Sequence, residues 1–294
     1  MVGDDAESLG ESQTLVGSAP GSDQRTVIEA SSGMGSLHLR ELLAYRDLLY
    51  FFIWRDVKVR YKQTALGAAW AVLQPLLLMV VFTIFLGHLA HVSSDGQPYV
   101  LFSYSALVPW TLFSSSLAAS SQSLVGSANL VSKVYFPRII APIAATGSYI
   151  LDFVISLSLL FVLLPVYGHG VGLRVLWLPM LSFLIVLVSL AVGIWLAALN
   201  VKYRDVQYAV PFLIQLWLFL TPVAYPSSIV PARWRLVFGL NPMAGVVEAF
   251  RWAILGTQPA PGGMFVVSTL AALVVLVVGG GYFARVNRTF ADVI

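Results

Sequence analysis

The sequence predicts an all-α integral membrane protein with six transmembrane helices. Two observations carry this prediction. Hydrophobic residues make up 58% of the 294 positions and charged residues 11%, with a mean hydropathy of +0.83, values far outside those of a soluble domain of this length. The uncharged residues also form long runs, and the first, from Gln63 to Ser94, holds 32 positions without Asp, Glu, Lys or Arg. Runs of this length suit membrane spans.

Composition also narrows the function classes. The net charge of +3 does not indicate nucleic-acid binding, because the basic residues lie at the ends of apolar runs rather than on one face. The absence of cysteine rules out disulfides, thiolate metal sites and cysteine nucleophiles. His88 and His91 form the one close pair of histidines, and their position near the end of the first apolar run indicates loop residues rather than metal ligands. We expect no metal site.

The amino-terminal part divides into two segments. Residues 1–36 hold six acidic residues and one basic residue among many Ser and Gly, which predicts a disordered acidic tail. Residues 37–62 predict an amphipathic helix lying in the membrane interface, because its apolar residues are spaced to share a face. These are Leu39, Leu42, Leu43, Leu49, Tyr50, Ile53 and Val57. The helix ends in four cations within eight positions, Arg55, Lys58, Arg60 and Lys62.

The remaining residues, 63–294, are predicted to form a six-span membrane domain. A helix rises about 1.5 Å per residue and the hydrocarbon layer is roughly 30 Å thick, so each span needs about 20 residues. The predicted spans are 64–89, 99–121, 139–167, 175–201, 206–225 and 264–284. This arrangement places 13 of the 17 Lys and Arg residues on the side of both termini. By the positive-inside rule that side is cytoplasmic.

Two connections differ from ordinary loops. The segment from Ser123 to Arg138 predicts a short cytoplasmic helix, too polar to span the membrane. The segment from Pro226 to Gly263 is long and partly apolar, and it contains an Asn241-Pro242 helix start, a helix to about Leu255 and a C-cap at Gly256. A helix of about 14 residues does not cross the bilayer, so we expect re-entrant or interfacial helices on the outer side between spans five and six.

A few charged residues lie in apolar segments, where burying a charge costs free energy. Asp152 interrupts the third span, so its carboxylate is expected to face the bundle interior or a partner, in a structural role or as a proton relay. The proton-relay interpretation corresponds to a proton-coupled secondary transporter. Glu248 and Arg251 lie at i and i+3 on the outer helix, the spacing of an intrahelical ion pair, which either holds the outer helices together or contacts substrate.

Aromatic residues that lie deeper than the interfacial belts are candidates for lining a conduit, since their rings offer a surface for sugar rings. They are Trp70, Trp195, Trp217 and Phe219. Lining and ordinary packing both remain open for them. The sequence has no phosphate-binding loop, no acidic pair for glycosyl transfer and no Ser, His and acid set in an external segment, so the chain is not expected to be an enzyme. Uphill transport then depends on a gradient or on another subunit.

Several segments occur together in an order known from one family. They are Arg55 to Lys62 (RDVKVRYK) with Leu66, Gly67 and Trp70, Gln74 to Leu76 (QPL), Asn129 to Arg138 (NLVSKVYFPR), Asn200 to Asp205 (NVKYRD), and Asn241 to Met243 (NPM) with Glu248, Arg251 and Trp252. In these segments the chain resembles the membrane-spanning subunits of ABC transporters of the type-2 permease class. The specific resemblance is to exporters of lipid-linked polysaccharides such as O-antigen and teichoic acid, and it covers about residues 40 to 290.

This resemblance implies an ATP-driven exporter permease in the bacterial inner membrane, with a role in lipopolysaccharide or related envelope-glycan biosynthesis. It implies a homodimer with two copies of a separate ATPase subunit, which binds ATP and Mg²⁺, and no cofactor on this chain. An exporter of drugs or small lipids is the nearest alternative. The interface helix resembles the family's gate helix, and the outer helices resemble those that close the outer mouth. One further segment resembles the family's coupling helix, which docks on the ATPase. Its residues are Asn129, Leu130, Ser132, Lys133, Tyr135 and Phe136.

The four cations of the interface helix have two possible roles. They suit the pyrophosphate of a polyprenyl-linked substrate, because cations at headgroup level attract phosphate. They also suit simple positive-inside anchoring.

Overall fold

The structure is a computed structural model, and it describes residues 43–62, 67–131, 133, 136–256, 260 and 262–287. Within these residues it is all-helical and has no strand. The predicted tail at 1–36 lies outside the described residues and stays a prediction.

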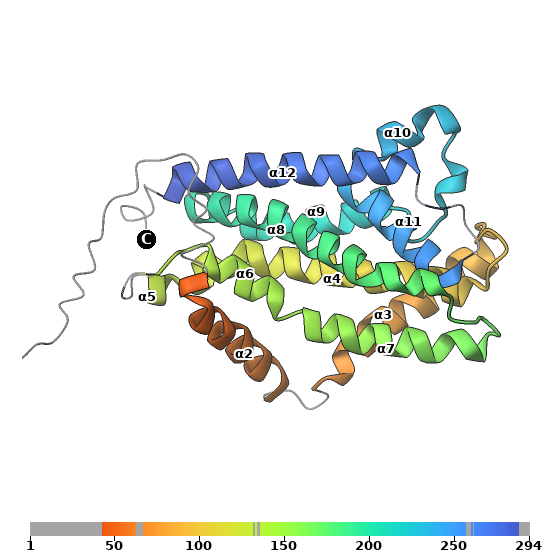
Figure 1. Cartoon of the computed structure of the whole chain (residues 1–294), viewed down its shortest axis with the longest axis horizontal. Helices are drawn as coiled ribbons and strands as arrows, with labels where there is room; N and C mark the ends of the chain where they lie inside the picture. The colour runs from red at the N-terminus through yellow and green to blue at the C-terminus, as the bar shows by residue number, and fades with distance from the viewer. Residues whose placement is uncertain are drawn as a thin grey trace, which may run out of the picture. The chain divides into compact units, whose positions relative to one another are not determined.

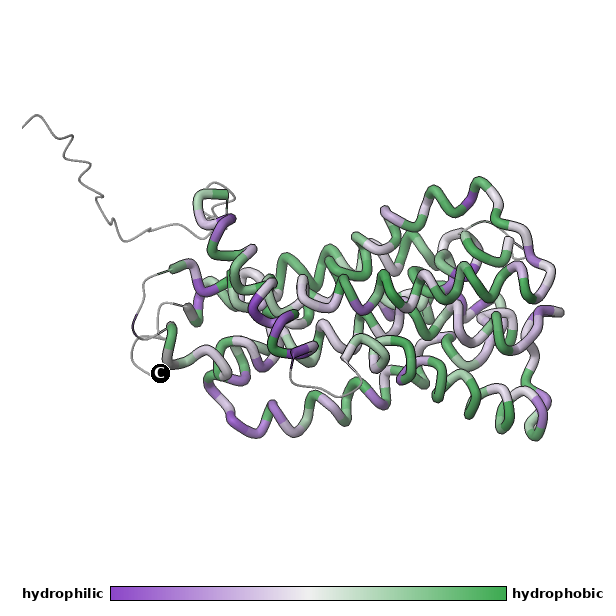
Figure 2. The backbone as a smooth tube through the Cα atoms, turned by 90° about the horizontal axis from the view of Figure 1, so that it is seen from below, coloured by the Kyte–Doolittle hydropathy of each residue, from purple (hydrophilic) through white to green (hydrophobic). Residues whose placement is uncertain are grey.

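The helices follow the order of the predicted segments (Figure 1). The α-helices are α2 (Arg46–Lys62), α3 (Ala69–Phe82), α4 (Tyr99–Gly126), α5 (Ala128–Val131), α6 (Ile140–Gly147), α7 (Ile150–Val166), α8 (Leu178–Lys202), α9 (Val206–Leu220), α10 (Arg235–Phe238), α11 (Pro242–Leu255) and α12 (Gly263–Asn287). A π-helix, η1 (Thr83–Leu89), continues α3, and the 3-10 helices are η2 (Leu173–Trp177), η3 (Ser227–Ile229) and η4 (Ala232–Trp234). Hydrophobic residues dominate the long helices (Figure 2).

Helix α4 is the centre of the bundle and packs against α3, α6, α7, α8 and α11. Its buried serines do not break it, because their hydroxyls donate to carbonyls one turn back, as Ser105 does to Phe102 and Ser121 to Ala118. The helix therefore continues past the predicted end at 121 to Gly126. It meets α8 closely at Gly193, where the Ser120 side chain leaves no room for a Cβ.

Among the described residues, five helical segments are long and apolar enough to cross a membrane, and they begin at Ala69, Tyr99, Ile140, Leu173 and Gly263. The predicted fifth span, 206–225, is shorter than expected. It forms α9, which ends at Leu220 because Thr221 is extended. Its 15 residues cover roughly 22 Å at 1.5 Å per residue, less than the roughly 30 Å of hydrocarbon. Length therefore confirms five of the six predicted spans, with α9 as a sixth, shorter apolar helix.

The connections gather at two opposite ends of the bundle (Figure 1). At one end, hydrogen bonds join the turn after η1 to the turns after α7 and α9: Asp95 with Ser228 at 2.8 Å, and Gln97 with His169 at 2.7 Å. Helix α5 lies at the other end. A chain that crosses the membrane repeatedly requires its connections to lie alternately at the two ends of the bundle.

Helix α11 forms as predicted at both of its ends. The Asn241 side chain accepts from the backbone N–H of Met243 at 3.0 Å, and Pro242 occupies the first turn. Gly256 adopts the left-handed conformation at the C-cap, with φ of 71°. The helix is buried against α4, α8 and α12.

Helix α2 buries part of the predicted apolar face. Val57 of that face is buried, and Leu49 and Ile53 pack on a cluster that includes Phe52 and residues of α6. Tyr50 of the same face is 67% exposed. The buried part is the part that α6 covers.

Candidate functional site

The four cations at the end of α2 have different surroundings. Arg55 pairs with the adjacent Asp56 at 2.8 Å, and its guanidinium lies 4.9 Å from the centre of the Phe52 ring. Lys58 and Lys62 are exposed. Arg60 alone of the four turns into the bundle and reaches α7. The predicted cluster is therefore one inward-facing cation and three at the surface.

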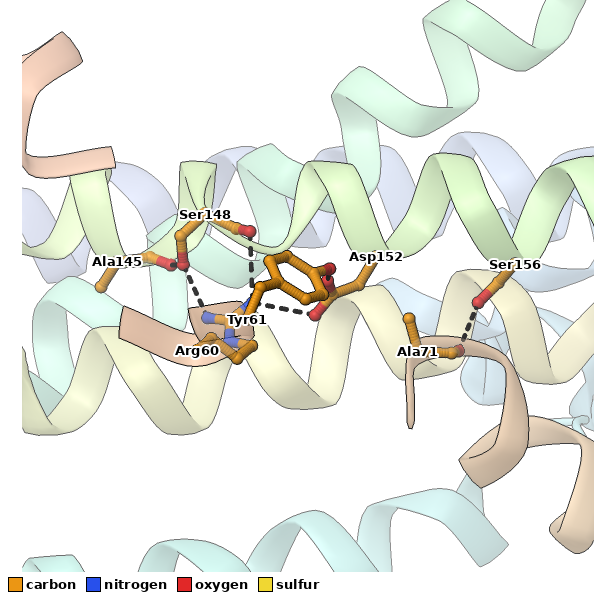
Figure 3. A network of polar contacts seen from close by, with 7 residues as sticks. All are labelled: Arg60, Tyr61, Ala71, Ala145, Ser148, Asp152 and Ser156. Atoms are coloured by element: carbon orange, nitrogen blue, oxygen red, sulfur yellow. Dashed lines mark hydrogen bonds and ion pairs between the residues drawn. The ribbon is translucent and has the colours of Figure 1, made fainter. Parts of the chain in front are cut away.

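Arg60 forms a polar network with the start of α7 (Figure 3). Its Nη1 donates to Asp152 Oδ2 at 2.8 Å and to the Ser148 carbonyl at 3.2 Å, and its Nη2 donates to the Ser148 hydroxyl at 2.9 Å. The guanidinium also lies 3.7 Å from the centre of the Tyr149 ring. The hydroxyl of Tyr61 donates to the second carboxylate oxygen of Asp152. Two consecutive residues of α2 thus hold one carboxylate.

The break between α6 and α7 sets this geometry. Asp152 lies in the first turn of α7, where the helix dipole favours a negative charge, so Arg60 is not its sole stabilisation. The side chains of Arg60 and Asp152 are 28% and 18% exposed, so the pair is partly solvated. Burial, and then the hydrogen bond to the Asp152 carboxylate, raise the pKa of the Tyr61 phenol, which therefore stays protonated and keeps donating.

Arg60 lines two hollows. One has a volume of about 350 Å³ and is lined by Arg60, Tyr61 and Asp152 together with Trp70. The other has a volume of about 500 Å³ and is lined by Arg60 with residues of α2, α4 and α6. Chemically, a guanidinium and a phenol that converge beside open volume form a site for an oxyanion.

The predicted coupling segment is attached to α2. Phe136 is buried and its ring meets Phe52 edge to face, with centroids 5.6 Å apart. Leu130 packs on the same cluster, whereas Lys133 is exposed. Phe136 was predicted as an ATPase contact, but its burial against α2 makes it an internal anchor. Asn129 lies in α5, and Ser132 and Tyr135 lie outside the described residues.

The four aromatic candidates for channel lining differ in their surroundings, and Trp195 is 41% exposed on α8. Trp70 is 51% exposed and lines the smaller hollow, and Phe219 is 58% exposed on α9. Trp217 packs instead: its ring lies 5.0 Å from that of Phe113, and its indole N–H donates to Asn241 at 2.8 Å. Its role in the described structure is to fix α9 to α4 and α11.

The predicted ion pair of Glu248 and Arg251 does not form. Glu248 accepts from the Ser227 hydroxyl, and Arg251 donates to the backbone carbonyls of Pro222 and Val223 at 2.8 and 3.3 Å. The i, i+3 spacing is right, but the turn after α9 supplies carbonyls that accept hydrogen bonds from the guanidinium. Arg251 is completely buried, with its guanidinium 3.8 Å from the centre of the Phe102 ring.

Burial shifts the pKa values of both Glu248 and Arg251, which lie on a helix too short to span the membrane. It raises the pKa of the Glu248 carboxyl and lowers the pKa of Arg251 to about 10. Arg251 therefore stays charged near neutral pH. One oxygen of Glu248 and two nitrogens of Arg251 have no hydrogen-bond partner.

Sequence reasoning missed two contributors to the inner site, which is the network around Arg60 and Asp152: Tyr61 and Ser148. A signal existed for Tyr61, because it adjoins Arg60 in a cationic run next to a span. Nothing in the sequence marked Ser148, because its role depends on the break between α6 and α7.

Comparison with known proteins places the chain in a family. A model of the ABC-2 type transporter matches residues 47–255. The O-antigen export system permease protein RfbA of Myxococcus xanthus is 32% identical over 258 residues, which cover 86% of this chain and 98% of that protein. A protein of the same name from Klebsiella pneumoniae is 28% identical, covering 88% and 100%. The polysialic acid transport protein KpsM of Escherichia coli is 22% identical, covering 76% and 88%. The chain is a multi-pass membrane protein that belongs to the ABC-2 type transporter family.

Proposed function

We propose that this chain is the membrane-spanning subunit of an ATP-driven exporter that moves a lipid-linked polysaccharide, such as O-antigen, outward from the cytoplasmic side. The observation that carries the proposal is the near-complete match to a relative named for O-antigen export, 98% of which is covered at 32% identity. The second relative named for such export is covered completely. A match over almost the whole length of these relatives supports a similar arrangement of spans and loops.

The energy source in this proposal is a separate ATPase subunit, two copies of which bind at the cytoplasmic face and hold ATP and Mg²⁺. Its contact is the loop at 129–136, where Lys133 is exposed. Phe136 and Leu130 join this loop to the Phe52 side of α2. A push on the loop therefore reaches α2 through packed rings rather than through a long linker.

The channel in this proposal forms between two copies of the chain, at the inner membrane, with both termini cytoplasmic. Helix α9 supports this arrangement because large side chains on it face outward: Tyr208 is 76% exposed, Phe212 is 61% exposed and Phe219 is 58% exposed. A second copy would meet α9 and the outward face of α3. Trp70 and Phe219 are then the aromatic residues placed to meet a glycan.

The test is reconstitution with the partner. The chain contains no cysteine, so a single cysteine at Lys133 gives one crosslinking position. We expect it to crosslink to the ATPase subunit, and proteoliposomes with both subunits to move lipid-linked glycan only with ATP. A chain that purifies alone and transports without ATP would contradict the proposal.

The cations of α2 give a second readout. Neutralising Arg60 and Lys62 together is expected to reduce export more than membrane insertion, because the charges meet substrate phosphate as well as hold topology. Equal loss of export and insertion would indicate that these cations serve only to anchor the segment at the membrane.

A further inference from the structure

In the Arg60 network, the carboxylate of Asp152 is an oxyanion that accepts hydrogen bonds from donors on α2. Arg60 Nη1 donates to Asp152 Oδ2 at 2.8 Å, and the Tyr61 hydroxyl donates to Oδ1 (Figure 3). Both donors come from the last turn of α2, and the acceptor comes from α7. The carboxylate is the charged acceptor of this contact, and the carbonyl and hydroxyl of Ser148 are neutral acceptors for Arg60. The carboxylate occupies the place that an external oxyanion would take.

Space and solvation allow exchange at this contact. Arg60 and Asp152 are both partly exposed, and the hollow of about 350 Å³ reaches Arg60, Tyr61 and Asp152. A partly solvated ion pair has little net stability, so its replacement by another ion pair costs little. Gln74, Thr111 and Ser115 line the same hollow and offer further polar groups.

Chemistry decides which anion replaces the carboxylate. A phosphate group carries more charge than a carboxylate and has three strong acceptor oxygens. Arginine binds phosphate in a two-pronged geometry, and a protonated phenol adds a donor. A phosphate would also repel Asp152, so the two anions do not share the donors.

We infer that Asp152 is an internal substitute for the phosphate of the substrate. In the empty protein it holds Arg60 and Tyr61, and with them the end of α2, against α7. A diphosphate ester that enters the smaller hollow takes over both donors and releases Asp152, which separates α2 from α7. Asp152 thus sets the affinity of the site and keeps α2 seated until ligand arrives. This inference rests on the proposed function, because its ligand is the diphosphate of a lipid-linked glycan.

The test is ligand binding to the full chain in nanodiscs. Farnesyl diphosphate is the probe, with inorganic pyrophosphate and farnesol as comparison ligands. We expect Asp152→Asn to bind farnesyl diphosphate about tenfold more tightly than the wild type, because the competitor has lost its charge. Arg60→Gln is expected to bind it about tenfold more weakly, and Tyr61→Phe to show a smaller loss. Equal or weaker binding by Asp152→Asn would overturn the inference.

A matched control separates competition from general charge. Asp56→Asn removes one negative charge from α2 itself, where Asp56 pairs with Arg55. The inference requires a much smaller gain from this change than from Asp152→Asn. Equal gains from the two variants would indicate only long-range electrostatics and would contradict it. Thermal unfolding of each variant identifies any that binds weakly because it is misfolded, and Arg60→Lys then replaces Arg60→Gln.

The comparison ligands identify the source of the phosphate. If pyrophosphate gives the same ranking of variants, the site exists and recognises the diphosphate alone. If the ranking appears with farnesyl diphosphate but not with pyrophosphate, the site exists and also requires the lipid chain. Failure here is distinct from failure of the proposed function. If export needs ATP but Asp152→Asn does not bind farnesyl diphosphate more tightly, this inference is wrong and the proposed function stands. If Asp152→Asn does bind more tightly but the chain has no ATPase partner, the exporter proposal is wrong and the site stands.

Discussion

The inner and outer charged sites of this protein hold similar groups in opposite ways. At the inner site, Arg60 and Asp152 pair directly, remain partly exposed and adjoin open volume. At the outer site, Arg251 is completely buried, donates to backbone carbonyls and does not pair with Glu248. The difference teaches that a direct ion pair is not the mark of a rigid site. The outer arginine is fixed by its surroundings, whereas the inner pair is built to exchange partners.

The largest expected effect comes from the outer arginine. Arg251→Ala should lower the free energy of unfolding by about 3–5 kcal/mol, because it leaves a cavity, two carbonyls without donors and a buried Glu248 without its nearest cation. Reversible unfolding in mixed micelles measures it. Arg251→Lys is the control, with an intermediate loss expected because it keeps the charge without the planar fork. A loss below about 1 kcal/mol for Arg251→Ala would contradict the contrast between the two sites.

A pair of glycines compares packing at the two sites. A Cβ on Gly245 would lie 2.7 Å from the backbone of Phe265 in α12, whereas a Cβ on Gly147 would lie 2.9 Å from the flexible end of Ile53 in α2. Gly245→Ala should therefore cost about 1–3 kcal/mol in the same unfolding assay. Gly147→Ala should cost less than about 1 kcal/mol, because Ile53 can move and alanine favours the helix. The reverse order would show that α2 is the more tightly held element.

The inner ion pair should contribute little to stability. A double-mutant cycle with Arg60→Gln and Asp152→Asn is expected to give a coupling energy below about 1 kcal/mol, as for other partly exposed pairs. Unfolding of the four proteins in mixed micelles provides the cycle. A coupling of about 3 kcal/mol would make the pair a structural brace and remove the basis for exchange.

The smallest effect is the pH dependence at the outer site. Burial raises the pKa of Glu248 in the folded protein, so the folded state binds a proton more readily than the unfolded state. The stabilisation from this group is complete below its unfolded pKa and is lost as pH rises through its folded pKa. Glu248→Gln should flatten that part of the unfolding profile. An unchanged profile would show that Glu248 does not titrate in this range.

The fold was largely readable from the sequence, since uncharged runs and cap residues are local signals. The ends of α11 at Asn241 and Gly256 were predicted because capping depends on neighbouring residues alone. The end of α9 was predicted wrongly, and the part of α2 that is buried was not predicted, because both depend on what packs beside them. In the candidate site, Arg60 and Asp152 were singled out separately. Their pairing across 92 positions was not predicted, since it follows from the break between α6 and α7.

The central claim is that the end of α2 leaves α7 when ligand releases Asp152. Because α2 also packs against α6, a covalent bond between α2 and α6 should prevent that movement. A disulfide between cysteines at Ile53 and Gly147, introduced into the cysteine-free chain, would fasten the two helices, since a Gly147 Cβ lies 3.2 Å from Ile53 Cγ1. We expect the oxidised protein to bind the ATPase subunit but not to move glycan in proteoliposomes, and reduction to restore transport. Transport by the oxidised protein at the rate of the reduced protein would contradict the account.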